Sequence, residues 1–62
     1  MSKAHPTVPH LFSIRELADR LGVSAKTISR WIDDGSLHAH RLGRQIRISE
    51  DDAASFIAAR RR

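Results

Sequence analysis

The sequence contains no cysteine, so neither a disulfide framework nor a cysteine-based zinc site is expected. It also lacks a long apolar run, and we therefore expect neither a membrane span nor a signal peptide. Its 62 residues are too few for two domains, and a chain of this length buries only about 60% of the surface that it exposes when unfolded. We expect one small cytoplasmic domain without room for a deep substrate cavity, and not an enzyme.

Positive charge is in excess, with 11 Lys and Arg against 7 Asp and Glu. The charges are segregated: residues 36–48 carry three arginines and no acid, residues 50–52 are all acidic, and residues 60–62 are all arginine. A basic segment in mid-domain followed by a basic tail is the electrostatic footprint of a protein that binds a polyanion. Because solvated basic faces are also common, this pattern alone does not distinguish nucleic-acid binding from simple solvation.

The sequence predicts a first helix over residues 14–21, preceded by a flexible arm over residues 1–11 that holds both prolines. Ser13 and Glu16 have the spacing of a capping box, which marks where the helix begins. Gly22 can adopt the left-handed conformation that ends a helix.

A second helix is predicted from its N-cap Ser24 to about Asp34, where Gly35 stops it. Lys26 and Arg30 lie almost opposite its apolar face, which is formed by Ile28, Trp31 and Ile32. Two helices joined by a three-residue turn have the geometry of a helix-turn-helix motif, in which the second helix enters the DNA major groove.

Residues 36–48 change from helical to strand periodicity and predict a β-hairpin. Its strands are expected at 36–41 and 45–48, around a turn at 42–44 that contains glycine. On the second strand Ile46 and Ile48 are expected to face inward, whereas Gln45 and Arg47 face outward. This hairpin would be a two-stranded wing with a basic tip.

Ser49 is the predicted cap of a third helix, whose acidic first turn and arginine-rich last turn both suit the helix dipole. Its buried stripe is expected to consist of Ala53, Phe56 and Ile57. The predicted fold is therefore mainly α with a small β-hairpin, a winged helix-turn-helix domain over residues 12–60, followed by a basic tail at 61–62.

The candidate DNA-binding residues fall into two groups. Polar and cationic side chains in the first half of the second helix suit phosphates and base edges: Ser24, Lys26, Thr27, Ser29 and Arg30. The wing offers side chains for a neighbouring minor groove: His40, Arg41, Arg44 and Arg47.

His38 and His40 alternate along the predicted strand at the spacing of a pair of metal ligands. Their segment contains no Asp or Glu as a third ligand, so we expect no metal site and assign both histidines to solvent or DNA. Asp33 and Asp34 lie at helical spacing from Arg30 and can pair with it, either as a solvated pair or as a restraint on Arg30.

From Phe12 to Ala59 the sequence resembles the excisionase-type winged helix-turn-helix domains related to the MerR DNA-binding region. The most specific stretches are LGVSAKTISRWI, DDGSL and RLGRQIRIS. The resemblance implies that the second helix enters the major groove, that the wing contacts the minor groove or backbone, and that Trp31 belongs to the core. One departure is His38, which stands where members of the family frequently have proline.

Members of this family that stand alone at this length are often phage excisionases, which bind repeated sites, bend DNA and bias an integrase toward excision. The resemblance therefore implies double-stranded DNA and an integrase as partners, with self-association on DNA. From the sequence as a whole we expect no cofactor, no small-molecule ligand and no membrane partner. Two alternatives remain: a small transcriptional regulator and, from a different class, a protein-interaction or antitoxin module.

Overall fold

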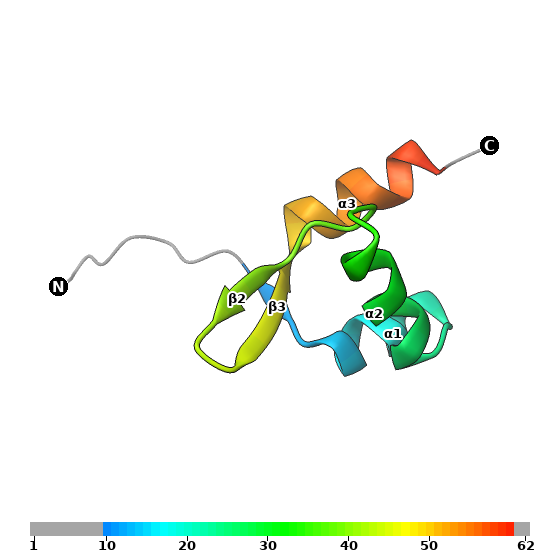
Figure 1. Ribbon diagram of the computed structural model, residues 1–62. Helices are drawn as coiled ribbons and strands as arrows, with labels where there is room; N and C mark the ends of the chain where they lie inside the picture. Colours follow the sequence, from blue (N-terminus) through cyan, green and yellow to red (C-terminus); the bar gives the residue numbers. More distant parts are fainter. Residues whose placement is uncertain (1–9, 61–62) are drawn as a thin grey trace, which may run out of the picture.

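The computed structural model describes residues 10–60, in which three helices and a three-stranded antiparallel sheet share one core (Figure 1). The elements in chain order are β1 (Leu11–Phe12), α1 (Ile14–Leu21), α2 (Ala25–Asp33), β2 (His40–Leu42), β3 (Gln45–Ser49) and α3 (Glu50–Ala59). This order confirms the predicted fold class, mainly helical with a small β wing. Residues 1–9 of the predicted arm and the predicted tail at 61–62 lie outside the described residues.

The local signals at α1 are confirmed in detail. The Ser13 hydroxyl accepts a hydrogen bond from the Glu16 backbone N–H at 3.0 Å, and the Glu16 carboxylate accepts one from the Ser13 N–H at 2.9 Å. Gly22 ends the helix with a φ of 69°, in the left-handed region that favours glycine. The predicted bounds of this helix match the observed ones because both ends depend on residues within a few positions of one another.

The second helix packs on the first through its apolar face. Its N-cap is Ser24, whose hydroxyl accepts the Thr27 N–H at 3.1 Å, as predicted. Ile28 is completely buried, and Trp31 packs against the same core with its ring 4.8 Å from that of Phe56. The cationic face of α2 is consequently turned away from the rest of the molecule.

The hairpin differs from the prediction in its first strand and its turn. β2 begins only at His40, and Leu42 pairs with Gln45, so the turn has two residues, Gly43 and Arg44.

The segment before β2 is not a strand because Leu37 is buried in the core, with 1% of its surface exposed. The backbone N–H of Leu37 also binds the carbonyl of Trp31 at 3.1 Å, which holds the segment against α2 rather than along the sheet.

A third strand, β1, was not predicted. Leu11 pairs with Ser49 and Phe12 with Ile48, which makes β3 the central strand of the sheet. Leu11 falls within the predicted arm, because two residues are too few to show strand periodicity. The pairing places Phe12 in the core beside α1.

The core is formed by eight buried apolar residues drawn from nearly every element: Phe12, Leu17, Ala18, Ile28, Leu37, Ile48, Ala53 and Phe56. Ile57 was wrongly predicted to belong to it, because 46% of its surface is exposed at the edge of α3. The third helix also ends earlier than predicted, with Arg60 as its C-cap. No helix within residues 10–60 is long and apolar enough to cross a membrane.

Candidate nucleic-acid interface

The outer face of α2 presents two cationic side chains to solvent. Lys26 and Arg30 are both exposed, on the side of the helix opposite the buried Ile28. Within residues 10–60 neither forms an ion pair, so their charges are not neutralised by the protein itself. A guanidinium or ammonium held outward on a helix that follows a tight turn is placed to contact phosphates or the guanine edge.

The hydroxyl groups of Ser24 and Thr27, which are predicted DNA-binding groups, form hydrogen bonds within the protein. Ser24 accepts the Thr27 N–H, and the two hydroxyl oxygens of Ser24 and Thr27 are 3.0 Å apart. Both hydroxyls therefore stabilise the beginning of α2, whereas Ser29 is half-buried along its side. The structure thus separates the two exposed cations from the hydroxyls that fix the helix end.

The predicted pairing of Arg30 with Asp33 or Asp34 is not among the ion pairs of residues 10–60. The Asp34 carboxylate instead accepts the Ser36 backbone N–H at 2.8 Å. Hydrogen bonding from Ser36 lowers the pKa of Asp34, which keeps this carboxylate charged and bound to the turn after α2. Arg30 is left available for an external partner.

The wing does not present its arginines on a single face. Arg41 lies opposite Ile46 across the hairpin, whereas Arg47 lies opposite His40. Because residues paired across an antiparallel ladder share a face and neighbours along a strand alternate, Arg41 and Arg47 point to opposite faces. Arg44 occupies the two-residue turn at the tip.

Arg47 is further distinguished by its contacts inside the hairpin. Its guanidinium donates to the Ile46 carbonyl at 2.8 Å and to the side-chain oxygen of Gln45, and the residue is half-buried. Arg41 and Arg44 are exposed. Of the three predicted wing arginines, these two are the ones free to contact an external polyanion without breaking a contact seen in the hairpin.

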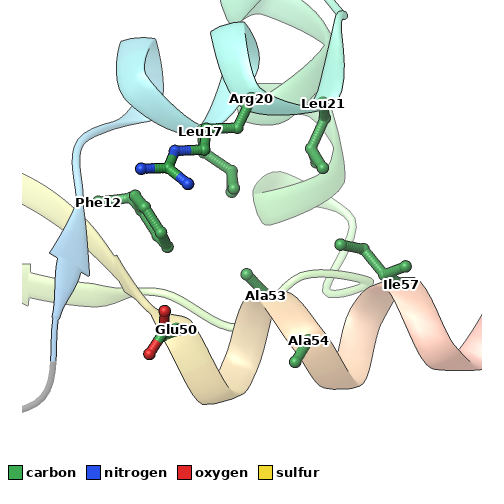
Figure 2. A pocket seen from close by; sticks show the side chains of 8 residues that line it. All are labelled: Phe12, Leu17, Arg20, Leu21, Glu50, Ala53, Ala54 and Ile57. Carbon is green, nitrogen blue, oxygen red and sulfur yellow. The ribbon is translucent and has the colours of Figure 1, made fainter.

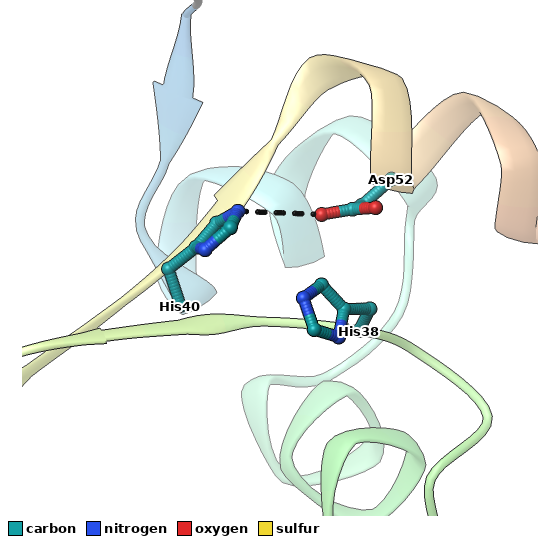
Figure 3. A group of neighbouring side chains, drawn as sticks. All are labelled: His38, His40 and Asp52. Atoms are coloured by element: carbon teal, nitrogen blue, oxygen red, sulfur yellow. Dashed lines mark ion pairs between the residues drawn. The ribbon is translucent and has the colours of Figure 1, made fainter.

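His40 lies at the base of the wing rather than at its tip. Figure 3 shows its imidazole turned toward α3, where Nε2 lies 3.5 Å from Oδ2 of Asp52. The expectation that no third ligand accompanies His38 and His40 is therefore wrong, because folding of α3 against the sheet brings Asp52 to them. Asp52 is twelve or more positions away from both histidines in the sequence, so no local pattern predicts their contact.

A shallow apolar groove lies on a different part of the surface, between α1 and α3 (Figure 2). Arg20 and Glu50 are its charged members, and the remaining lining is apolar: Phe12, Leu17, Leu21, Ala53, Ala54 and Ile57. The predicted DNA-binding residues are not part of this lining. The cationic face of α2 and the groove are therefore separate surfaces.

Comparison with known proteins identifies the family of this chain. The helix-turn-helix domain family matches residues 11–61. The chain is 47% identical over 51 residues to a protein named excisionase from Mycobacterium phage D29, a match that covers 81% of this chain and 91% of that protein.

The same region resembles part of longer bacterial proteins. Uncharacterised proteins of Mycobacterium tuberculosis (strain H37Rv) and Mycobacterium bovis are each 43% identical to the chain over 47 residues. The match covers 76% of this chain and 41% of each of theirs, so the chain spans less than half of their length. No solved structure matches the chain.

Proposed function

The chain belongs to the helix-turn-helix domain family, and on that premise we propose that it is a phage excisionase, which binds double-stranded DNA and bends it at an attachment site. The identity to the excisionase of phage D29 over most of both chains supports this role. In this proposal the protein acts as an architectural partner of an integrase and catalyses no strand exchange itself. Residues 11–60, which include β1, serve as the DNA-binding domain.

The exposed cationic face of α2 carries the proposal. Lys26 and Arg30 point outward from a helix whose other side is fixed in the core, so the helix can enter the major groove as a rigid unit. Arg44 at the tip of the wing and Arg41 beside it reach an adjoining groove or the phosphate backbone. Ser24, Thr27, Ser29, His40 and Arg47 remain in the proposed interface in supporting positions.

A small domain makes few contacts with DNA, so we expect tight binding to require several copies on adjacent sites. Self-association on DNA and contact with an integrase are therefore part of the proposal. A band-shift titration on DNA that spans repeated sites should show cooperative filling, whereas independent filling of each site would contradict self-association.

DNA binding itself is tested by removing one charge at a time. Lys26→Ala and Arg30→Ala should each weaken binding, and each should reduce the dependence of log affinity on log salt by about 0.9 for a lost phosphate contact. Arg20→Gln is the matched control, because it removes one positive charge from the groove between α1 and α3. Equal losses in all three variants would indicate a general charge effect and would contradict an interface centred on α2.

The excisionase role needs a second readout. In a recombination assay with the phage integrase and both product attachment sites, the wild-type chain should increase excision, and Arg30→Ala should increase it less. Specific DNA binding without any effect on the direction of recombination would overturn the excisionase role and favour a transcriptional regulator.

A further inference from the structure

Three side chains that can ligate a metal ion meet where the wing joins the rest of the molecule (Figure 3). His38 lies in the connection between α2 and β2, His40 begins β2, and Asp52 lies in the first turn of α3. The ligating atoms all lie within 4.8 Å of one another. Within residues 10–60 this is the one group of three such side chains, and of its members only His40 also belongs to the proposed DNA interface.

The chemistry of the three ligand atoms indicates which metal ions the group can bind. Two imidazole nitrogens and one carboxylate oxygen suit zinc and the neighbouring divalent transition metals, whereas magnesium and calcium take oxygen ligands. Zinc binds nitrogen and oxygen at about 2.0–2.2 Å, so two ligands of a tetrahedral ion lie about 3.3 Å apart. The 3.5 Å between His40 Nε2 and Asp52 Oδ2 is already close to this spacing.

Only a small movement of exposed side chains is needed to bring the three ligand atoms to the spacing around a tetrahedral ion. The widest separation in the group must close by at most about 1.5 Å to reach tetrahedral spacing. The rings of His38 and His40 are exposed, with centroids 5.2 Å apart and planes at 86°, so side-chain rotation can achieve the closure. No buried residue needs to move, and the contact between His40 and Asp52 holds two ligands in place beforehand.

We propose that His38, His40 and Asp52 bind one zinc-class divalent ion, with water in the fourth position. The ligands come from the segment after α2, from β2 and from α3, so the ion joins the base of the wing to α3. It would restrain the wing relative to the helices in a chain that has no cysteine to form a conventional zinc site. This binding does not depend on DNA.

The test uses the full chain at neutral pH, with Co²⁺ followed by its visible absorption and Zn²⁺ followed by calorimetry. The wild-type chain should bind one equivalent of either ion, and Zn²⁺ should displace Co²⁺. Loss of an outer partner of a metal ligand already costs about 10–100-fold in affinity, so loss of a ligand should weaken binding at least about tenfold. We expect this loss in His38→Ala/His40→Ala and in Asp52→Asn.

The chain supplies a matched control for each variant. His5→Ala/His10→Ala removes the same number of the 4 histidines but leaves the group intact, and Asp51→Asn removes a neighbouring charge from the first turn of α3. Both should bind within about twofold of the wild type, well inside the tenfold loss expected for a ligand. Circular dichroism without metal shows whether each variant is folded.

His38→Ala provides the deciding single substitution, because His38 is exposed and is not part of the His40–Asp52 ion pair. If the three residues form only an ion pair, His38→Ala will bind metal as the wild type does, and the proposal is overturned. It is also overturned if the wild type binds less than one equivalent, or if His5→Ala/His10→Ala loses as much affinity as His38→Ala/His40→Ala. Unchanged binding by Asp52→Asn would remove the link to α3.

Discussion

The rings of Trp31 and Phe56 pack with their centroids 4.8 Å apart, and through this contact α2 is held against α3. The Arg60 guanidinium lies over both rings, 4.6 Å from the Phe56 centroid and 5.6 Å from that of Trp31. Trp31 is one residue beyond Arg30, so the position of the cationic face depends on this aromatic pair. The same contact packs Trp31 against the core, in agreement with the place that the family resemblance implies for it.

Phe56→Ala should destabilise the domain strongly, because it leaves a cavity in the core and removes the partner of Trp31. Truncation of a buried phenylalanine costs about 3–5 kcal/mol, which approaches the whole stability of a small domain. Phe56→Leu should cost less than Phe56→Ala, because the leucine side chain fills part of the space that alanine leaves empty. Urea unfolding of both variants checks this, and equal midpoints for the two would contradict it.

Acidification should weaken the capping box at α1. The backbone hydrogen bond from Ser13 lowers the pKa of Glu16, so the charged carboxylate stabilises the folded state. This contribution is fully present above the pKa of Glu16 in the unfolded chain and is lost as the pH falls through the lower folded pKa. Thermal unfolding from about pH 6 to about pH 3 should therefore show a smaller loss of Tm for Glu16→Gln than for the wild type. Identical pH profiles would mean that the carboxylate charge contributes nothing here.

Gly43→Ala should destabilise the wing by about 1 kcal/mol, because an L side chain is strained in the left-handed region. Gly43 has a φ of 64°, and no atom lies within 4 Å of the position that a Cβ would occupy, so the cost is conformational and not steric. Gly43→Asn should cost less, since asparagine tolerates this conformation. Chemical denaturation compares the two variants, and a smaller cost for alanine than for asparagine would refute the conformational explanation.

Arg44→Ala and Arg47→Ala should separate DNA contact from hairpin stability. Arg44 is exposed at the tip, so its loss should reduce the salt dependence of DNA binding by about 0.9 per phosphate contact. Arg47 donates to Ile46 and Gln45, so its loss should lower the Tm and change the salt dependence less. Band shifts at several salt concentrations, together with thermal melts, measure both effects. The reverse assignment of effects would make Arg47, and not Arg44, the main DNA contact of the wing.

Most of the helical structure could be predicted from the sequence because its signals are local. Ser13, Ser24 and Ser49 each cap a helix through a backbone N–H three residues later, and each cap was found from spacing alone. The apolar faces of α1 and α2 follow from helical periodicity in the same way. The family resemblance and the predicted cationic face of α2 both depend on this local information.

The features that were missed depend on contacts between distant residues. Phe12 pairs with Ile48, a partner 36 positions away by their residue numbers, and two strand residues show no period of their own. The strand periodicity of residues 36–41 predicts a strand that includes Leu37, yet burial of Leu37 against α2 overrides that preference. Asp52 reaches His40 only because α3 packs against the sheet, so the third residue of the proposed metal site has no local signal in the sequence.

β2 lies at an edge of the sheet, and this position affects the tendency of the protein to aggregate. An open strand edge is a template on which another chain can add a strand, and such addition leads to aggregation. Here β2 has only three residues and includes the exposed Arg41. A neighbouring molecule therefore finds too little unpaired backbone at β2 to extend the sheet, so the assembly of several copies on DNA that we propose is not expected to proceed to strand addition.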